Sequence, residues 1–277
     1  MQIFPNADLR SFIKHYLFID IFNFDQNHIR IFADGNTGIV FCLGDGMLLQ
    51  NGEKLPRVFA YGQINEYQNL EVYGNVSLVI TVFRPYGMNG ILGIPGTVIN
   101  NIIVDCEVIS GSNVRELYEQ LCELQEKNKI VEKLDTYFTV LMEKNDKPLQ
   151  PMIAAATNWI FSKKGIFTAK ELINYTGCQQ RTIERNFKSN VGLSPKKLAG
   201  IIRLHYFLGE IRNTEAANNF TTLVYDAGYY DQAHLIRDFQ KFVGLTPSAY
   251  HLKHHKLAVN VVHLPVENIQ SQVKSTK

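Results

Sequence analysis

Two stretches of the sequence carry side chains that can hydrogen-bond to DNA, and these side chains stand in matching places. Arg and Gln can each form two hydrogen bonds with the edge of a guanine or an adenine, and Lys suits phosphate groups as a flexible point charge. The candidate DNA-binding residues are Gln180, Arg181, Glu184, Arg185 and Lys188 in the first stretch, and Gln232, His234, Arg237 and Lys241 in the second.

The two stretches belong to a repeat. FKSNVGLSP and FQKFVGLTP begin at Phe187 and Phe239, which are 239 − 187 = 52 residues apart, and the same offset relates Arg185 to Arg237. A solenoid needs three or more repeats to bury a continuous core. Two copies instead predict a duplicated supersecondary unit that meets one partner at two places.

Each copy has the pattern of a helix-turn-helix, whose second helix enters the major groove of DNA. A short helix, a turn with glycine and a longer helix follow one another, and the longer helices are expected at about 179–190 and 231–242. A long helix that begins near Pro195 is expected to join the copies. The predicted core positions are Leu172, Ile173, Ile183 and Phe187 in the first copy, and Leu223, Val224, Leu235 and Phe239 in the second.

Charge is divided unevenly along the chain. Residues 1–150 hold 12 Lys and Arg against 18 Asp and Glu, a net charge of −6, whereas residues 151–255 hold 13 against 7, a net charge of +6. The segment 256–277 holds 3 against 1, a net charge of +2. A basic half next to an acidic half indicates that the basic half binds an anion.

The first hundred residues predict β structure. IRIFADGNTGIVFCLGDGMLLQNG and VSLVITVFRP alternate β-prone runs with glycine turns, the pattern of an antiparallel sheet. Helical spacing follows over 113–143, where Asn113 is expected to cap a helix with Glu116 three residues later. We expect three parts: a β-rich sensor domain at 1–147, a DNA-binding domain at 148–255 and a polar tail at 256–277. A strand within LAVNVVHLPV remains an alternative for that tail.

Residues 152–253 resemble the DNA-binding domain of the AraC/XylS family of bacterial transcription regulators. The resemblance lies in RTIERNFKSNVGLSP, in the Arg203-Leu204 pair and in AGYYDQAHLIRDFQKFVGLTPSAY, while Gln179 replaces the serine-like cap of the first recognition helix. It implies two helix-turn-helix subdomains joined by a linker helix, binding to two successive major grooves of double-stranded DNA, and RNA polymerase as a further partner. FADGNTGIVFCLGDG resembles, more weakly, a sensor domain of some of these regulators, which implies a barrel-like domain without identifying its ligand.

Other chemistry finds little support in the sequence. His251, His254 and His255 have helical spacing for a metal site but no Cys or carboxylate nearby, so we expect no metal. Phosphate-loop, GxGxxG and GxSxG motifs are absent, and Asp34/Asp45 and Glu66/Glu71 suit turns and polar loops. We therefore expect no enzyme and no cofactor.

The compartment is inferred from the cysteines and the start of the chain. The four cysteines form no CxxC pair, which is typical of reduced thiols, and no signal peptide or apolar run of membrane-spanning length is visible. We expect a cytoplasmic protein without membrane contact.

The fold class expected is α+β: a β-rich, barrel-like sensor domain with helices, followed by an all-α domain of two helix-turn-helix subdomains. The function expected is sequence-specific DNA binding in transcription regulation, as activator or repressor, under an unknown small-molecule or protein effector. The apolar stripe of 113–143 suggests either a homodimer or a cap on the sheet. Two alternatives stay open: a ligand-binding or enzymatic barrel with a helical protein-interaction module, and an architectural DNA binder without an effector.

Overall fold

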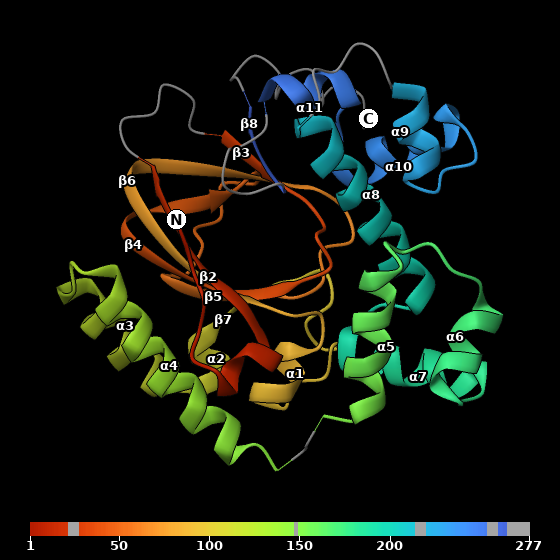
Figure 1. Cartoon of the computed structure of the whole chain (residues 1–277). Coiled ribbons are helices and arrows are strands. Elements are labelled where there is room, and N and C mark those ends of the chain that lie inside the picture. The colour runs from red at the N-terminus through yellow and green to blue at the C-terminus, as the bar shows by residue number, and fades with distance from the viewer. Residues whose placement is uncertain (22–27, 147–148, 214–219, 254–259, 265–277) are drawn as a thin grey trace.

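Segments rich in Val, Ile and Phe form one antiparallel sheet in the N-terminal part of the chain (Figure 1). The computed structural model describes residues 1–21, 28–146, 149–213, 220–253 and 260–264 of the 277-residue chain. β-branched and aromatic side chains favour such a half-buried pleated surface. The strands are β1 (Gln2–Ile3), β2 (Ile13–Ile21), β3 (His28–Ile31), β4 (Thr37–Leu49), β5 (Val58–Tyr61), β6 (Gln68–Phe83), β7 (Ile103–Asp105) and β8 (Val261–Leu264).

The sheet is open, so the expected barrel-like shape holds only loosely. Its strands run in the order β1-β2-β6-β4-β5-β7, and β3 lies beside the first part of β6. The longest pair joins β4 to β6, from Thr37 opposite Phe83 to Leu49 opposite Leu70, with a shift of register between Gly44 and Gly46. Such a bulge bends a strand and increases its twist. Within the described residues, β1 and β7 end this order without pairing to each other.

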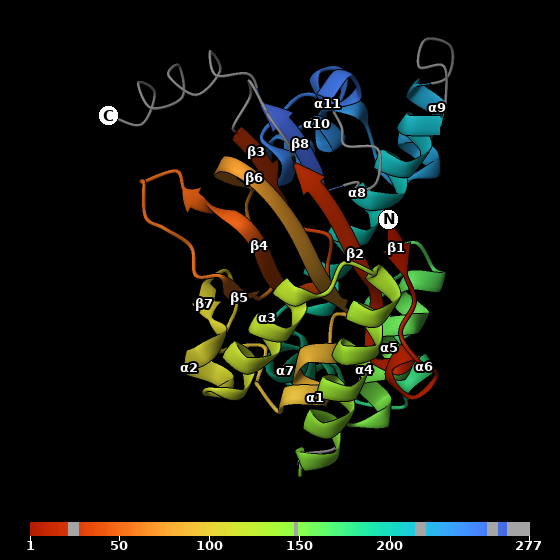
Figure 2. The same cartoon turned by 90° about the vertical axis from the view of Figure 1, so that its left-hand side faces the viewer.

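The strand alternation gives the sheet two apolar faces. On β2, Tyr16 and Phe18 pack with the helices of the N-terminal part, whereas Leu17 and Ile19 belong to a separate cluster on the other face. Figures 1 and 2 show α3 and α4 on the first side and α8 on the second. The N-terminal helices are η1 (Asp8–Ser11), α1 (Gly87–Leu92), α2 (Cys106–Ser110), α3 (Asn113–Glu123) and α4 (Lys127–Lys144).

The expected single helix over 113–143 is two helices. Leu124 leaves α3 in an extended conformation, and α4 starts only at Lys127. The expected cap is also wrong, because Asn113 is the first helical residue and Ser112 precedes it without a side-chain hydrogen bond. The apolar stripe packs against the sheet, as the buried Leu121 and Leu134 show. This accounts for the stripe without a second chain.

The C-terminal part is helical and contains two helix-turn-helix units. The first is formed by α6 and α7 and the second by α9 and α10, with α8 between them (Figure 1). The predicted recognition helices agree with α7 and α10 to within one residue. The helices are α5 (Pro151–Ser162), α6 (Ala169–Thr176), α7 (Gln180–Val191), α8 (Pro195–Asn213), α9 (Phe220–Asp226), α10 (Gln232–Val243) and α11 (Pro247–Lys253).

The sheet and the helical part share one hydrophobic core. Phe32 and Ala33, which follow β3, belong to the same buried cluster as Leu198 and Leu208 of α8. The chain also returns to the sheet, because β8 pairs with β3 and fulfils the strand alternative for LAVNVVHLPV. The predicted domain limits remain predictions, and most of 256–277 lies outside the described residues. No helix in the described part of the chain is long and apolar enough to cross a membrane.

Replacing a repeated phenylalanine should destabilise its subdomain. Phe187 is 0% exposed, so Phe187→Ala should leave a cavity and lower the free energy of unfolding by about 3–5 kcal/mol. Phe4 is 67% exposed, and Phe4→Ala should change it by less than about 0.5 kcal/mol. Urea denaturation followed by circular dichroism measures both. Equal stabilities of the two variants would contradict this packing.

Candidate DNA interface and interdomain cavity

The predicted DNA-binding residues lie on α7 and α10, and all nine reach the surface. Eight of them are exposed and His234 is half-buried. Ile183 and Phe187 of α7, with Leu235 and Phe239 of α10, are buried on the opposite sides of these helices, as the sequence predicts. The structure therefore separates the core positions from the candidate base-contacting positions within each helix.

Local hydrogen bonds orient some of these side chains. Gln180 Nε2 donates to Glu184 Oε1 over 2.9 Å, one turn along α7. Arg237 Nε donates to the Ala233 carbonyl oxygen of its own helix over 3.2 Å. In the second copy the repeated arginine is thus hydrogen-bonded to the backbone of its own helix.

The two recognition helices begin differently. The Asp231 carboxylate accepts a hydrogen bond from the His234 amide over 2.7 Å, which satisfies one of the free donors at the start of α10. Gln179 precedes α7 without a side-chain cap, in agreement with its departure from the usual residue type. An uncapped first turn leaves amide donors of α7 available to a phosphate group.

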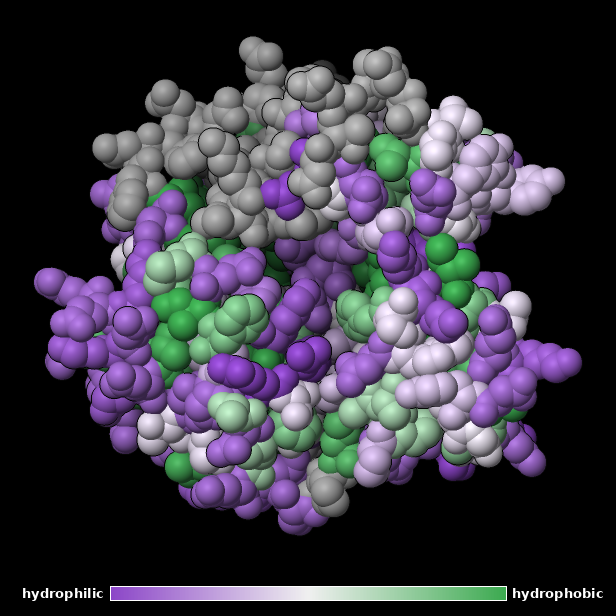
Figure 3. All heavy atoms as spheres, in the orientation of Figure 1, coloured by the Kyte–Doolittle hydropathy of each residue, from purple (hydrophilic) through white to green (hydrophobic). Residues whose placement is uncertain are grey.

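A cavity of about 400 Å³ lies between the second face of the sheet and α8. This volume is within the usual range for small-molecule sites, roughly 300–1,000 Å³. Figure 3 shows the molecular surface hollowed where the sheet meets the helical part. Apolar side chains of five strands form its inner wall: Leu17, Ile19, Ile21, Ile29, Ile31, Val40, Met47, Phe59, Leu70, Leu78, Ile80 and Val82.

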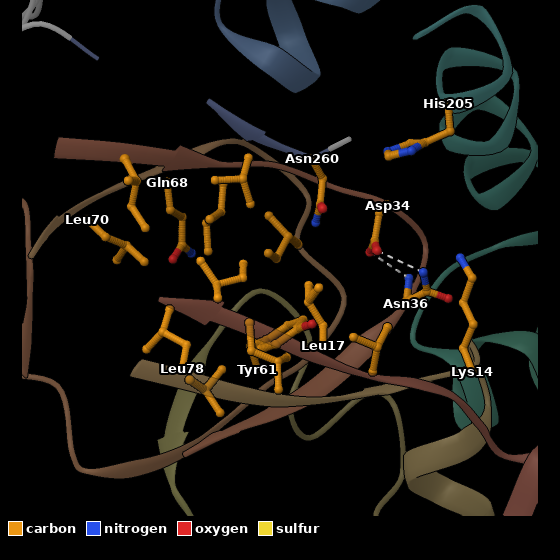
Figure 4. A pocket seen from close by; sticks show the side chains of 18 of the residues that line it. Lys14, Leu17, Asp34, Asn36, Tyr61, Gln68, Leu70, Leu78, His205 and Asn260 are labelled. Carbon is orange, nitrogen blue, oxygen red and sulfur yellow. Dashed lines mark hydrogen bonds between the residues drawn. The ribbon is translucent and has the colours of Figure 1, made fainter. Parts of the chain in front are cut away.

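Polar residues gather at one end of this cavity, next to α8 (Figure 4). Both carboxylate oxygens of Asp34 accept hydrogen bonds from Asn36, one from its amide nitrogen over 2.9 Å and one from Nδ2 over 2.8 Å. Lys14 of β2 and Lys164, which follows α5, also line the cavity. Lys164 Nζ lies 4.0 Å from the centre of the Tyr206 ring.

Two histidines at the polar end are kept neutral. Burial lowers the pKa of His15 to about 4, and the charge of Lys14 lowers it further, whereas Asp34 acts in the opposite direction. Burial also lowers the pKa of His205. Nε2 of His205 donates to the Ala33 carbonyl oxygen over 2.7 Å, since a carbonyl can only accept. The charged residues that line the cavity are then Lys14, Lys164 and Asp34, a net charge of 2 − 1 = +1.

The sequence did not indicate the cavity. The one sequence feature that is related to the cavity is the weak sensor-like motif FADGNTGIVFCLGDG, because Asp34, Asn36 and Val40 of this motif line the cavity. Of the carboxylates expected in turns and polar loops, Asp45 lies at the bulge between Gly44 and Gly46 and accepts a hydrogen bond from the Asn75 amide. Glu71 lies on β6 instead of in a loop, with Oε2 3.9 Å from Nε2 of His28 on β3. The turn expected at Asp45 is thus a bulge of β4, and the polar loop expected at Glu71 is wrong, because β-prone residues on both sides of it continue the strand.

The remaining candidate groups form no site in the part of the chain that the structure describes. Of the three histidines with helical spacing, His254 and His255 lie outside the described residues. No cluster of three or more His, Cys, Asp and Glu residues is found among the described ones. The four cysteines are free thiols, of which Cys42 and Cys106 are buried and Cys122 is exposed.

Comparison with known sequences assigns a domain family to each part of the chain. Residues 172–253 match the profile of a family described as "Helix-turn-helix domain". Residues 1–105 match a "Domain of unknown function (DUF6597)". No curated protein sequence is significantly similar to the chain.

The fold is similar to that of ToxT from Vibrio cholerae. The crystal structure of unsaturated fatty acid bound ToxT from strain SCE256 has a TM-score of 0.50 and 13% identity, covering 86% of this chain and 95% of that chain. ToxT from Vibrio cholerae O395 has a TM-score of 0.49 and 11% identity, covering 88% and 98%. Because the sequence identity is low, the similarity to the fatty-acid-bound ToxT structure establishes a common two-domain fold and nothing more.

The helix-turn-helix match, together with two units exposing their second helices, defines a DNA-binding transcription regulator. Its C-terminal domain is of the AraC type, as the resemblance in sequence implied.

Acidification should destabilise the protein through the two cavity histidines. Both have folded-state pKa values below the unfolded value of 6.5, so the unfolded chain binds more protons once the pH falls below 6.5. Their stabilising contribution is complete above that pH and is lost toward the folded-state pKa, by at most about 1.4 kcal/mol per pH unit for each proton. Urea unfolding of wild type, His15→Asn and His205→Asn at pH 7, 6 and 5 measures this loss. We expect the free energy of unfolding to fall less between pH 7 and pH 5 in both variants than in wild type. Equal decreases in all three proteins would contradict the role of these histidines.

Proposed function

We propose that the chain is a ligand-controlled transcription regulator, in which the N-terminal domain senses the ligand and the C-terminal domain binds DNA. One observation carries the control by a ligand. The cavity is walled by the sheet on one side and by Ile202, His205 and Tyr206 of α8 on the other. A molecule in this cavity therefore touches the helix that joins the two DNA-binding units.

The DNA-binding side of the proposal rests on α7 and α10. We assign direct base contacts to Arg181 and Gln180 of α7 and to Gln232, His234 and Arg237 of α10, because Arg and Gln match purine edges. We assign the phosphate contacts to Lys188 and Lys241. Glu184 and Arg185 complete the exposed face of α7. The two helices would enter successive major grooves about 34 Å apart on one face of the duplex.

The cavity suits an elongated apolar molecule with an anionic head group. Its strand-lined wall is apolar, which favours a hydrocarbon chain. Its polar end has a net positive charge from Lys14 and Lys164, one from each part of the chain. An unsaturated fatty acid, which the similar ToxT structure contains, has this chemistry. We therefore propose a fatty acid or a similar amphiphilic acid as the effector.

The proposal includes the cellular setting. We place the protein in the cytoplasm, assign it no catalytic step, and propose RNA polymerase as a further contact once the protein is bound to DNA. A homodimer remains a prediction, since the apolar stripe that suggested it packs on the sheet. Light scattering over a concentration series decides between a monomer and a dimer.

Substitutions in α7 should separate base contacts from phosphate contacts. Arg181→Ala should weaken binding to the preferred site by about 1–3 kcal/mol and relax the preference at one base pair. Lys188→Ala should weaken binding to all DNA sequences alike. It should also reduce the slope of log affinity against log salt concentration by about one. Asn174→Ala, exposed on α6, is the control. Binding to a random-site library at several salt concentrations measures both effects. Unchanged base preferences in Arg181→Ala would remove α7 from base recognition.

The effector assignment predicts a specific dependence on charge. Wild type should bind an unsaturated long-chain fatty acid, and Lys14→Gln or Lys164→Gln should weaken this binding about tenfold through loss of a charge-assisted hydrogen bond. The methyl ester of the same acid should bind weakly and equally to all variants. Lys54→Gln, exposed and away from the cavity, is the control.

Calorimetry measures these affinities, and fluorescence anisotropy with a selected DNA site measures the effect on DNA binding. Equal affinity of the acid for wild type and the Lys14→Gln/Lys164→Gln double variant would reject this head-group site. DNA affinity that is unchanged by a bound acid would reject its role as effector.

A further inference from the structure

Both recognition helices end against the sheet domain, at the same place in the repeat. Gly192 follows α7 and Gly244 follows α10, 52 residues later, and both have a left-handed conformation, with φ of 85° and 68°. Glycine adopts this conformation without the steric cost that other residues meet. A Cβ atom on Gly192 would lie 2.7 Å from the Gly96 carbonyl oxygen, and one on Gly244 would lie 2.6 Å from Arg30 Nη1. Each glycine therefore also allows the sheet domain to approach.

The first contact is made by the segment after α1. The Gly96 amide donates to the Ser189 carbonyl oxygen over 2.7 Å, and Asn100 Nδ2 donates to the Gly192 carbonyl oxygen over 3.0 Å. A Cβ atom on Gly96 would lie 2.3 Å from the Gly192 amide nitrogen, too close for any side chain. The backbone of the sheet domain thus lies directly on the last turn of α7.

The second contact is made by Arg30 of β3, which is 2% exposed. Its Nη1 donates to the Gly244 carbonyl oxygen over 2.7 Å and to the Val243 carbonyl oxygen over 3.3 Å. On the sheet side, Nε donates to Asn69 Oδ1 over 2.8 Å, and the guanidinium lies 4.0 Å from the centre of the Tyr67 ring. Arg30 thus joins the sheet to the end of α10.

The chemistry of Arg30 makes this second contact rigid. A guanidinium stays charged in proteins, so its burial is favourable only while its hydrogen bonds are made. The carbonyl oxygens at the end of a helix have the negative partial charge that suits it. Its planar geometry fixes the directions of Nε and Nη1 together. Small shifts of α10 relative to β3 therefore break a buried charged hydrogen bond.

These two contacts leave the DNA-facing surfaces free. They involve the C-terminal turns of α7 and α10, whereas Arg181 and Gln232 near the other ends are exposed. Both recognition helices are thus attached to one sheet, in addition to their connection through α8. Their separation depends on the sheet domain as well as on the linker helix.

We propose that Arg30 and the Gly96–Asn100 segment are positioning elements for DNA recognition, which hold the two recognition helices at one fixed separation. The inference rests on the proposed function, since it requires both helices to bind one duplex. Because a duplex turns once in about 10–10.5 base pairs, a fixed separation selects one spacing between the two contacted segments. Loss of either contact should relax this selection without changing which bases each helix prefers.

The test uses the full chain and a DNA site selected by wild type from random sequence. Duplexes with one or two base pairs inserted or removed between the contacted segments are compared with the selected site at one salt concentration. Arg30→Met and Gly96→Ala should bind the selected site about tenfold more weakly, and the ratio of affinities between correct and altered spacing should fall several-fold. Preferences within each contacted segment should stay as in wild type.

Matched controls exist for both changes. Arg57 donates through Nη1 to the carbonyl oxygens of Gly44 and Asp45 at the surface of the sheet domain, so Arg57→Met removes an arginine–carbonyl contact without touching α10. A Cβ atom added at Gly209 of α8 would meet no neighbouring side chain or other segment within 4 Å, so Gly209→Ala adds a methyl group without a clash. Both controls should retain the spacing ratio of wild type.

The possible results are distinct. If Arg30→Met fails to fold, as thermal unfolding would show, Arg30→Lys keeps the charge, loses the planar geometry and should still lower the spacing ratio. If the folded Arg30 and Gly96 variants keep the spacing ratio of wild type, the positioning role is overturned, while the proposed function is unaffected. Tighter binding of these variants at every spacing would also overturn the positioning role, because the contacts would then be inhibitory. Failure of wild type to bind any selected duplex would instead overturn the proposed function.

Discussion

The C-terminal end of each recognition helix needs hydrogen-bond partners, because the last carbonyl groups of a helix have none within it. In this chain part of that need is met by the other domain, through Asn100 at Gly192 and Arg30 at Gly244. The glycines that end the helices also leave room for the sheet domain to approach. One local requirement of helix ends therefore couples the DNA-binding units to the sheet, and the shared core around α8 reinforces this coupling.

The strand β3 occupies a central place in this arrangement. Ile29 and Ile31 line the cavity, while Arg30 between them contacts the end of α10. Alternation along a strand places neighbouring side chains on opposite faces, so a single strand borders both the proposed ligand site and a recognition helix. The other side of the cavity is α8, which links the two units. The proposed ligand site thus borders β3 and α8, which both contact the helix-turn-helix units.

The sequence predicted the parts that follow from local pattern. The repeat with its Gly and Pro residues located α7 and α10 to within one residue, because such residues end and start helices in few ways. The break after Leu124 was missed, since the apolar spacing continues across it. The cavity and the Arg30 contact were missed for a different reason. The apolar residues along the strands show that the second face of the sheet is apolar, but they do not show what covers it. A charged residue inside IRIF likewise gives no information about the group to which it hydrogen-bonds.

The central claim, that the sheet domain fixes the separation of the recognition helices, can be measured directly as a distance distribution. Spin labels at the exposed positions of Lys188 and Gln240, with Cys122 and Cys178 replaced by Ser, allow double electron–electron resonance between α7 and α10. We expect one narrow distance distribution in this background and a broader one after Arg30→Met. A distribution of the same width and position in both proteins would contradict it.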